Sequence, residues 1–172
     1  MTAPLNQSVT DSLPNLLGVS AESIPDELKT YRAWVLWKFA RVGDRWTKHP
    51  YCVHTGRRAS STDSRTWGPF EEVFEAYEAG GYDGIGFVFS SGDPFCGVDL
   101  DAAVDPETGE VADWAARIVG GLDGYTELSP SGTGLHVIVK GKVPSGGNRR
   151  GPVEMYDQGR FFTMTGRPLG DA

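Results

Sequence analysis

The chain has 172 residues, enough for one domain with a buried core that needs no disulfide or metal support. Its composition is 39% hydrophobic and 23% charged, with 23 glycines and 11 prolines, which excludes a disordered or fibrous protein and is typical of short strands. The formal net charge of -7, from 16 basic and 23 acidic residues, argues against a uniformly basic surface that coats DNA or an anionic membrane.

The pattern of apolar residues predicts an α+β fold with a mixed, mostly antiparallel sheet flanked by helices. Residues 1–22 are predicted to form an irregular tail, and residues 23–172 one folded domain. The order of elements is β-β-α-β-β-α-β-β-β-β, and the strands 84–90 and 95–101 are expected to pair across a turn. The other strands are predicted at 33–40, 45–48, 125–128, 135–140, 153–156 and 160–165, and the helices from Pro69 to Gly80-Gly81 and at 111–120.

The charge is distributed along the chain in blocks of opposite sign. Residues 31–67 carry eight basic and two acidic residues, residues 93–127 one basic and nine acidic, and residues 128–172 six basic and three acidic. Basic blocks on either side of an acidic centre suit a cation site in the middle and a polyanion at its edges. Scattered solvated charge is the alternative interpretation.

Two aspartates, Asp99 and Asp101, end an otherwise apolar strand. Since side chains alternate along a strand, both carboxylates lie on one face, and Val98 and Leu100 on the other. Neighbouring carboxylates repel unless a hard cation neutralises them, and Mg²⁺ or Mn²⁺ is the natural occupant. A purely structural pair of exposed acids is the alternative.

A third acid, Glu154, lies among apolar residues in a separate predicted strand, where a ligand from a neighbouring strand would lie. Asp157 follows in a predicted turn and is the second choice for this role. The predicted metal ligands are therefore Asp99, Asp101 and Glu154.

A turn rich in glycine and hydroxyl groups leads into the strand 135–140. Glycines allow close backbone approach, so amides and hydroxyls can converge on phosphate oxygens. The turn lacks the Walker A pattern, and a plain hairpin turn is the alternative. A lone histidine in a strand is more often structural, but one directly after such a turn is well placed to contact phosphate. The candidate residues are Ser131, Gly132, Thr133, Gly134 and His136.

Several basic residues are candidate phosphate contacts, with ordinary solvated surface as the alternative for each. Lys48, before Pro50, and Arg167, after a predicted strand end, are candidate triphosphate contacts. Four more cations lie around the stretch 145–148, which is typical of a loop that binds a nucleic-acid backbone. These four are Lys140, Lys142, Arg149 and Arg150.

Aromatic residues and potential zinc ligands are less informative. Trp34, Trp37 and Trp46 could stack on bases, but core packing is favoured. The run 49–54 supplies three potential zinc ligands and no fourth, so no zinc module is predicted. No apolar run approaches the roughly 18–20 residues that span a bilayer, and no export signal is present, so we expect a soluble, cytoplasmic protein.

Taken in order, these motifs resemble the archaeo-eukaryotic primase superfamily, and most closely the primase-polymerase domains at the N-termini of phage and plasmid replication proteins. The family pattern is an acid-x-acid strand, a strand that begins with a Ser-x-His-like motif, and a third acidic strand. The likeness covers about residues 31–168. It rests on Asp99-x-Asp101, SGTGLH at 131–136, VEMY at 153–156 and GRFFTMTG at 159–166, and upstream on WVLW at 34–37, Lys48-x-Pro50-Tyr51, STD at 61–63 and Trp67.

The resemblance implies the catalytic core of a template-directed nucleotidyltransferase that acts on a DNA template and primer with dNTP or NTP. The three matching acids would hold two Mg²⁺ or Mn²⁺ ions, and His136 with the Ser131 turn would hold the triphosphate. It also implies that the chain is the N-terminal part of a longer replication protein with helical and helicase domains, active in the bacterial host cytoplasm if phage-encoded.

Two other functions remain open at this point. A sugar-nucleotide glycosyltransferase also uses a D-x-D motif, but it does not account for Glu154 or for the Ser131 to His136 segment. A non-catalytic nucleic-acid-binding module could retain a primase-like fold, although the intact acids argue against a degenerate site.

Overall fold

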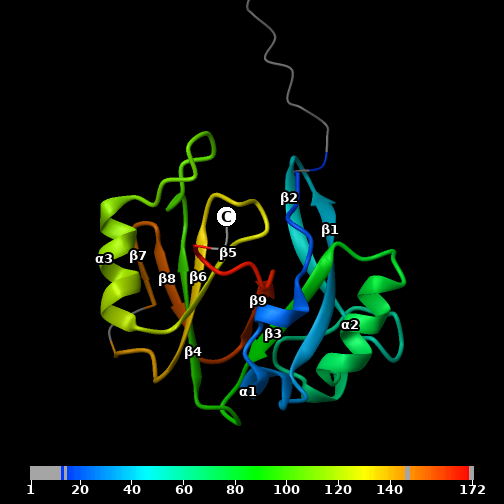
Figure 1. The fold of residues 1–172 in the computed structure, drawn as a ribbon. Coiled ribbons are helices and arrows are strands. Elements are labelled where there is room, and N and C mark those ends of the chain that lie inside the picture. The colour runs from blue at the N-terminus through cyan, green and yellow to red at the C-terminus, as the bar shows by residue number, and fades with distance from the viewer. Residues whose placement is uncertain (1–12, 14, 146–147, 171–172) are drawn as a thin grey trace, which may run out of the picture.

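The structure is a computed structural model that describes residues 13, 15–145 and 148–170 (Figure 1). Its strands form two antiparallel sheets: sheet A, with the order β2-β1-β3-β9, and sheet B, with the order β5-β6-β4-β8-β7. The predicted α+β fold with mostly antiparallel pairing is confirmed, with its strands divided between two sheets. The strands are β1 (Trp34–Val42), β2 (Arg45–Tyr51), β3 (Gly84–Phe89), β4 (Phe95–Leu100), β5 (Tyr125–Leu128), β6 (Leu135–Lys140), β7 (Arg149–Arg150), β8 (Val153–Tyr156) and β9 (Arg160–Met164).

The two longer helices lie on the outer sides of the molecule, with both sheets between them (Figure 1). Helix α2 (Phe70–Glu78) contacts β1 and β3, and buries Phe70 and Val73. Helix α3 (Asp113–Leu122) packs on sheet B, where Ala115 joins Val98 and Leu100 in a buried cluster. The short α1 (Asp26–Lys29) and the 3-10 turns Ala21–Ser23 and Ser64–Thr66 complete the described helices.

The prediction that the segments 84–90 and 95–101 pair with each other is wrong. β3 pairs with β1 and β9, whereas β4 pairs with β6 and β8 in the other sheet. The turn between them therefore crosses from sheet A to sheet B. The buried Asp93 carboxylate holds this turn by accepting hydrogen bonds from the amides of Ser90 at 2.8 Å and Phe95 at 2.9 Å. Both strands are buried along most of their length, so their apolar pattern does not identify their partners.

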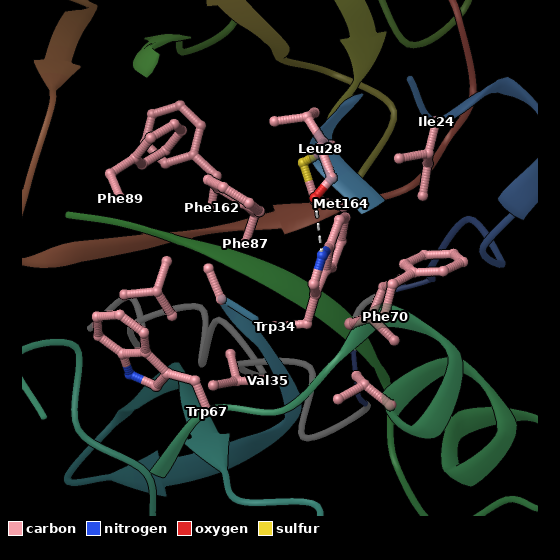
Figure 2. Packing of buried hydrophobic residues seen from close by; sticks show 14 of the residues in the cluster. Ile24, Leu28, Trp34, Val35, Trp67, Phe70, Phe87, Phe89, Phe162 and Met164 are labelled. Atoms are coloured by element: carbon pink, nitrogen blue, oxygen red, sulfur yellow. Dashed lines mark hydrogen bonds between the residues drawn. The ribbon is translucent and has the colours of Figure 1, made fainter. Parts of the chain in front are cut away.

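The main core surrounds Trp34, which is fully buried (Figure 2). Its ring lies 4.9 Å from that of Phe70 and 5.4 Å from that of Phe87, and its indole N–H donates to the Leu28 carbonyl at 3.2 Å. Trp37 is 1% exposed and donates to the Ile85 carbonyl. Core packing of these two tryptophans is therefore confirmed.

The segment before α1 contacts both sheets and α2. The amide of Leu17 donates to the Pro130 carbonyl, that of Ser20 to the Thr165 carbonyl, and that of Val19 to the Tyr77 hydroxyl. The rest of the predicted tail, residues 1–12 and 14, lies outside the described residues. Within the described part of the chain, no helix has the length and apolar character that a membrane crossing needs.

Candidate functional site

Five charged or polar side chains form a row across one face of sheet B, one from each strand. Glu127 on β5 pairs with His136 on β6, which pairs with Asp99 on β4. Asp99 pairs in turn with Glu154 on β8, and Glu154 with Arg149 on β7. Directly paired residues lie on the same face of an antiparallel sheet, so this charged row brings together residues that are far apart in sequence.

Asp99 occupies the middle of the charged row, and its side chain is 30% exposed. Burial raises the pKa of Asp99 above its usual value, and the negative charges of Asp101 and Glu154 act in the same direction. His136 and Lys48 act in the opposite direction. Asp101 follows the strand directly and is exposed. The charges of two neighbouring carboxylates therefore reach Asp99.

Glu154 is already engaged by neighbouring donors. Its Oε1 lies 2.9 Å from a guanidinium nitrogen of Arg149, and its Oε2 accepts a short hydrogen bond from the Tyr156 hydroxyl. A carboxylate offers about four lone-pair sites, so each oxygen keeps one further site. Among residues 13, 15–145 and 148–170, no three His, Cys, Asp or Glu side chains are arranged as a group that could hold a metal ion.

His136 lies between two acids of the charged row. Its Nε2 is 3.8 Å from Oδ1 of Asp99, and its Nδ1 is 3.5 Å from Oε1 of Glu127. The imidazole is 5% exposed and lies 5.1 Å from the ring of Phe162. Within the described residues its buried Nδ1 has no hydrogen-bond partner. The ring is therefore held by packing and by the charges on either side.

Glu127 belongs to the site but was not predicted from the sequence. This carboxylate is fully buried and accepts hydrogen bonds from the amides of Thr165 at 2.9 Å and Gly166 at 2.7 Å, and from the Tyr125 hydroxyl at 2.8 Å. Burial, followed by the charge of Glu127, raises the pKa of Tyr125. An acid in a short strand was the only sequence signal, and it does not show which residues surround it.

Lys48 reaches the charged row from the other sheet. It lines a pocket of about 220 Å³ together with Asp99, His136 and Glu154, and Arg160 lines the same pocket. Loss of hydration lowers the pKa of Lys48, and the charges of Asp99 and Asp101 oppose this change. The pocket therefore holds two basic side chains opposite the acids. Arg160 is a second residue to which the sequence analysis gave no role.

The predicted phosphate-binding turn lies beside the end of β4. The carbonyl of Thr133 accepts a hydrogen bond from the amide of Val104, and the amide of Gly134 donates to the Ser129 hydroxyl. Gly132 has a φ of +76°, and a Cβ on Gly134 would lie 3.0 Å from the Leu100 carbonyl. The turn borders a separate cavity of about 700 Å³ through Thr133. The turn thus lies beside Leu100, the residue before Asp101. Residues 131–134 do not line the pocket that contains Lys48.

The other predicted contacts are dispersed. Arg167 donates through Nε to the Gly18 carbonyl. Lys140 lies at the C-terminal end of β6, away from His136 near its start, and forms an ion pair with Glu27 at 2.7 Å. Arg149 belongs to the charged row. Arg150 and Lys142 are exposed, and residues 146–147 of the proposed DNA-binding loop lie outside the described residues. Asp157, the second choice for the metal, accepts a hydrogen bond from the amide of Val143 at 3.0 Å.

The chain was compared with protein-family models and with curated proteins. No protein-family model matches the chain. Over 145 residues the chain is 39% identical to a DNA primase-polymerase of Nitratiruptor phage NrS-1, and the match covers 81% of this chain. The chain spans about a fifth, 20%, of the length of that relative. This similarity supports a relationship between the chain and a primase-polymerase family.

Proposed function

We propose that this chain is the catalytic part of a phage or plasmid DNA primase-polymerase. In the reaction, the 3′-hydroxyl of a primer attacks the α-phosphorus of a nucleoside triphosphate, a new P–O bond forms, and pyrophosphate leaves. The observation that carries the proposal is the charged row across sheet B, with Lys48 opposite it. The similarity to the phage primase-polymerase supports the same assignment.

Asp99, Asp101 and Glu154 would hold the divalent ions, Mg²⁺ or Mn²⁺, after their side chains, which are not grouped around one point in the described residues, turn toward the ions. The fit rests on the chemistry of the donors: burial and two nearby carboxylates raise the pKa of Asp99, and a bound cation would offset this cost. Glu154 keeps unused lone pairs beside Arg149 and Tyr156. Such ions, when bound, activate the attacking hydroxyl and stabilise the charge of the reacting phosphates.

The basic side chains of the 220 Å³ pocket would bind the triphosphate. Lys48 supplies a positive charge at the pocket beside the acids, which would attract a phosphate. Arg160 lies against the Tyr156 ring at 4.8 Å, which orients its guanidinium toward the same pocket. His136 would contribute Nε2, with Glu127 behind its Nδ1. Two further predicted phosphate contacts lie outside this pocket. One is the turn of Ser131, Gly132, Thr133 and Gly134. The other is Arg167, whose Nε donates to the Gly18 carbonyl.

Primer extension tests the proposal. The wild-type chain is expected to extend a primed DNA template with dNTPs in Mg²⁺ or Mn²⁺. The double change Asp99→Ala with Asp101→Ala is expected to reduce the rate by at least about 100-fold, because removing charge stabilisation from a transition state costs on this order. Glu107→Gln removes an exposed acid elsewhere and serves as the matched control.

Three results would contradict the assignment. The first is failure of the wild-type chain to extend the primer, and the second is extension by the double variant at the wild-type rate. The third is an equal loss of activity in Glu107→Gln, which would show that removal of any acid has the same effect. Circular dichroism of each variant separates loss of the site from loss of the fold.

A further inference from the structure

The hairpin of β1 and β2 extends beyond the rest of sheet A (Figure 1). β1 pairs with β3 only from Trp34 to Trp37, but it pairs with β2 as far as Val42. Residues 38–42 and 45–49 therefore form a two-stranded ribbon. Described residues of other strands do not pair with this part of either strand.

One face of this ribbon carries aromatic and basic side chains in alternation. Phe39 pairs directly with Lys48, and Arg41 pairs directly with Trp46, so these four side chains share a face, here called the ribbon face. The rings of Phe39 and Trp46 are 6.2 Å apart, and Phe39 lies 5.3 Å from the buried Trp37. The aromatic run thus begins in the core and ends at the half-exposed Trp46.

The ribbon face continues directly into the candidate site. Lys48 belongs both to the ribbon face and to the pocket that contains Asp99. Its ammonium lies 5.7 Å from the Trp37 ring, which connects the basic and aromatic parts of the surface. A chain that leaves the pocket on this side would therefore pass over Phe39 and Trp46.

The charge of this region matches a polyanion. The block 31–67, which includes the hairpin, carries eight basic and two acidic residues. Asp44, in the turn of the hairpin, forms an exposed ion pair with Arg41 at 4.0 Å, which a phosphate would compete with, and Asp83 accepts the Phe39 amide at 2.7 Å. Positive charge beside sequence-tolerant aromatic platforms is the arrangement that binds single-stranded nucleic acids.

We propose that the ribbon face binds the unpaired template strand of DNA next to the candidate site, by stacking bases on Trp46 and Phe39 and by contacting phosphates through Arg41. This proposal rests on the proposed function for the identity of the strand. An unpaired strand is the occupant because its base faces are free to stack, whereas the bases of a duplex already stack on each other. Phosphate contacts fix the position of the strand without reading its sequence.

Direct binding of a labelled oligodeoxythymidine tests this surface, with fluorescence anisotropy as the readout and no nucleotide or metal present. Trp46→Ala is expected to raise Kd roughly 10-fold, the loss expected for one stacked base, and Trp46→Phe to restore most of the affinity. Arg41→Ala is expected to lower the slope of log K against log salt by about 1.

The controls use matched positions away from the ribbon face. Val42 is 56% exposed and belongs to the opposite face of the same ribbon, so Val42→Ala is expected to leave Kd unchanged. Arg117 is exposed on α3, across sheet B, so Arg117→Ala removes the same charge from a remote surface. Melting curves of Trp46→Ala show whether the hairpin still folds, and Trp46→Phe carries the test if it does not.

Three outcomes would overturn the proposal: no binding of single-stranded DNA by the wild-type chain, equal affinities of Trp46→Ala and Val42→Ala, or tighter binding of duplex that is insensitive to Trp46. The binding assay also includes the double variant Asp99→Ala with Asp101→Ala. If wild type fails to extend primers but binds single strands through Trp46, the proposed function fails and the surface stands. If primers are extended and Trp46→Ala binds normally, the surface fails alone.

Discussion

Asp99 lies between His136 and Glu154 in the charged row, and its folded environment disfavours the ionised form. Burial comes first among the causes that raise its pKa above the ordinary value of 3.8. A raised pKa means that the folded chain holds this proton more tightly than the unfolded chain does. Between the unfolded and the folded pKa, the free energy of unfolding therefore falls as pH rises. The residue proposed to bind metal thus lowers stability at neutral pH when no cation is bound.

Replacing this carboxylate with its neutral isostere tests that sign. With EDTA present, Asp99→Asn is expected to melt above wild type at pH 7, by about 2–4 °C for each kcal/mol gained. The difference is expected to shrink as the pH falls toward 3.8, where the wild-type carboxyl is increasingly protonated in both states. Thermal melts across this pH range measure it, with Glu107→Gln as the neutral control. A variant that is less stable than wild type at pH 7 would contradict the account.

The periodicity of apolar residues predicted the helices and the faces of the strands, but it did not predict which strands pair. The apolar spacing after Pro69 predicted α2, and alternation correctly assigned Val98 and Leu100 to the face of β4 that packs under α3. The partners of β4 could not be predicted, because every residue of the strand except Asp99 is buried, and a largely apolar strand does not indicate which strands lie beside it. The charged row depends on that pairing, so the sequence identified Asp99, Glu154 and His136 but neither Glu127 nor the register that aligns them.

Glu127 joins two elements that the sequence analysis treated separately. It belongs to β5 in sheet B, and its carboxylate accepts both amides of the Thr165-Gly166 segment that follows β9 of sheet A. Thr165 is 1% exposed, and Gly166 is also buried. The same carboxylate lies behind His136. The Glu127 side chain thus connects the two sheets by hydrogen bonds at the candidate site.

We expect Glu127→Gln to lower the free energy of unfolding by about 1–3 kcal/mol, because an amide NH₂ replaces one acceptor oxygen and faces a buried donor. Urea unfolding measures this as a lower midpoint with an unchanged slope. Glu110→Gln, at an exposed position before α3, is the matched control and is expected to have no effect. A wild-type midpoint for Glu127→Gln would show that this carboxylate does not join the sheets.

The net charge of -7 does not show where the acidic and basic residues lie in the folded molecule. The acidic block 93–127 supplies Asp99 and Asp101, and the basic block 31–67 supplies Lys48 and the ribbon face. The fold brings these blocks together by setting sheet A beside sheet B (Figure 1). An acidic protein can therefore present a local surface suited to a polyanion beside a site suited to divalent cations.

Insertion of a single nucleotide opposite a defined template base measures whether the charged row supports template-directed synthesis. Each of the four dNTPs is offered opposite each of the four template bases, with Mn²⁺, to the wild-type chain and to Asp99→Asn. Wild type is expected to add the complementary nucleotide in preference to the other three, and Asp99→Asn is expected to add none at a comparable rate. Insertion that ignores the template base, or that proceeds equally in Asp99→Asn, would contradict the proposed function.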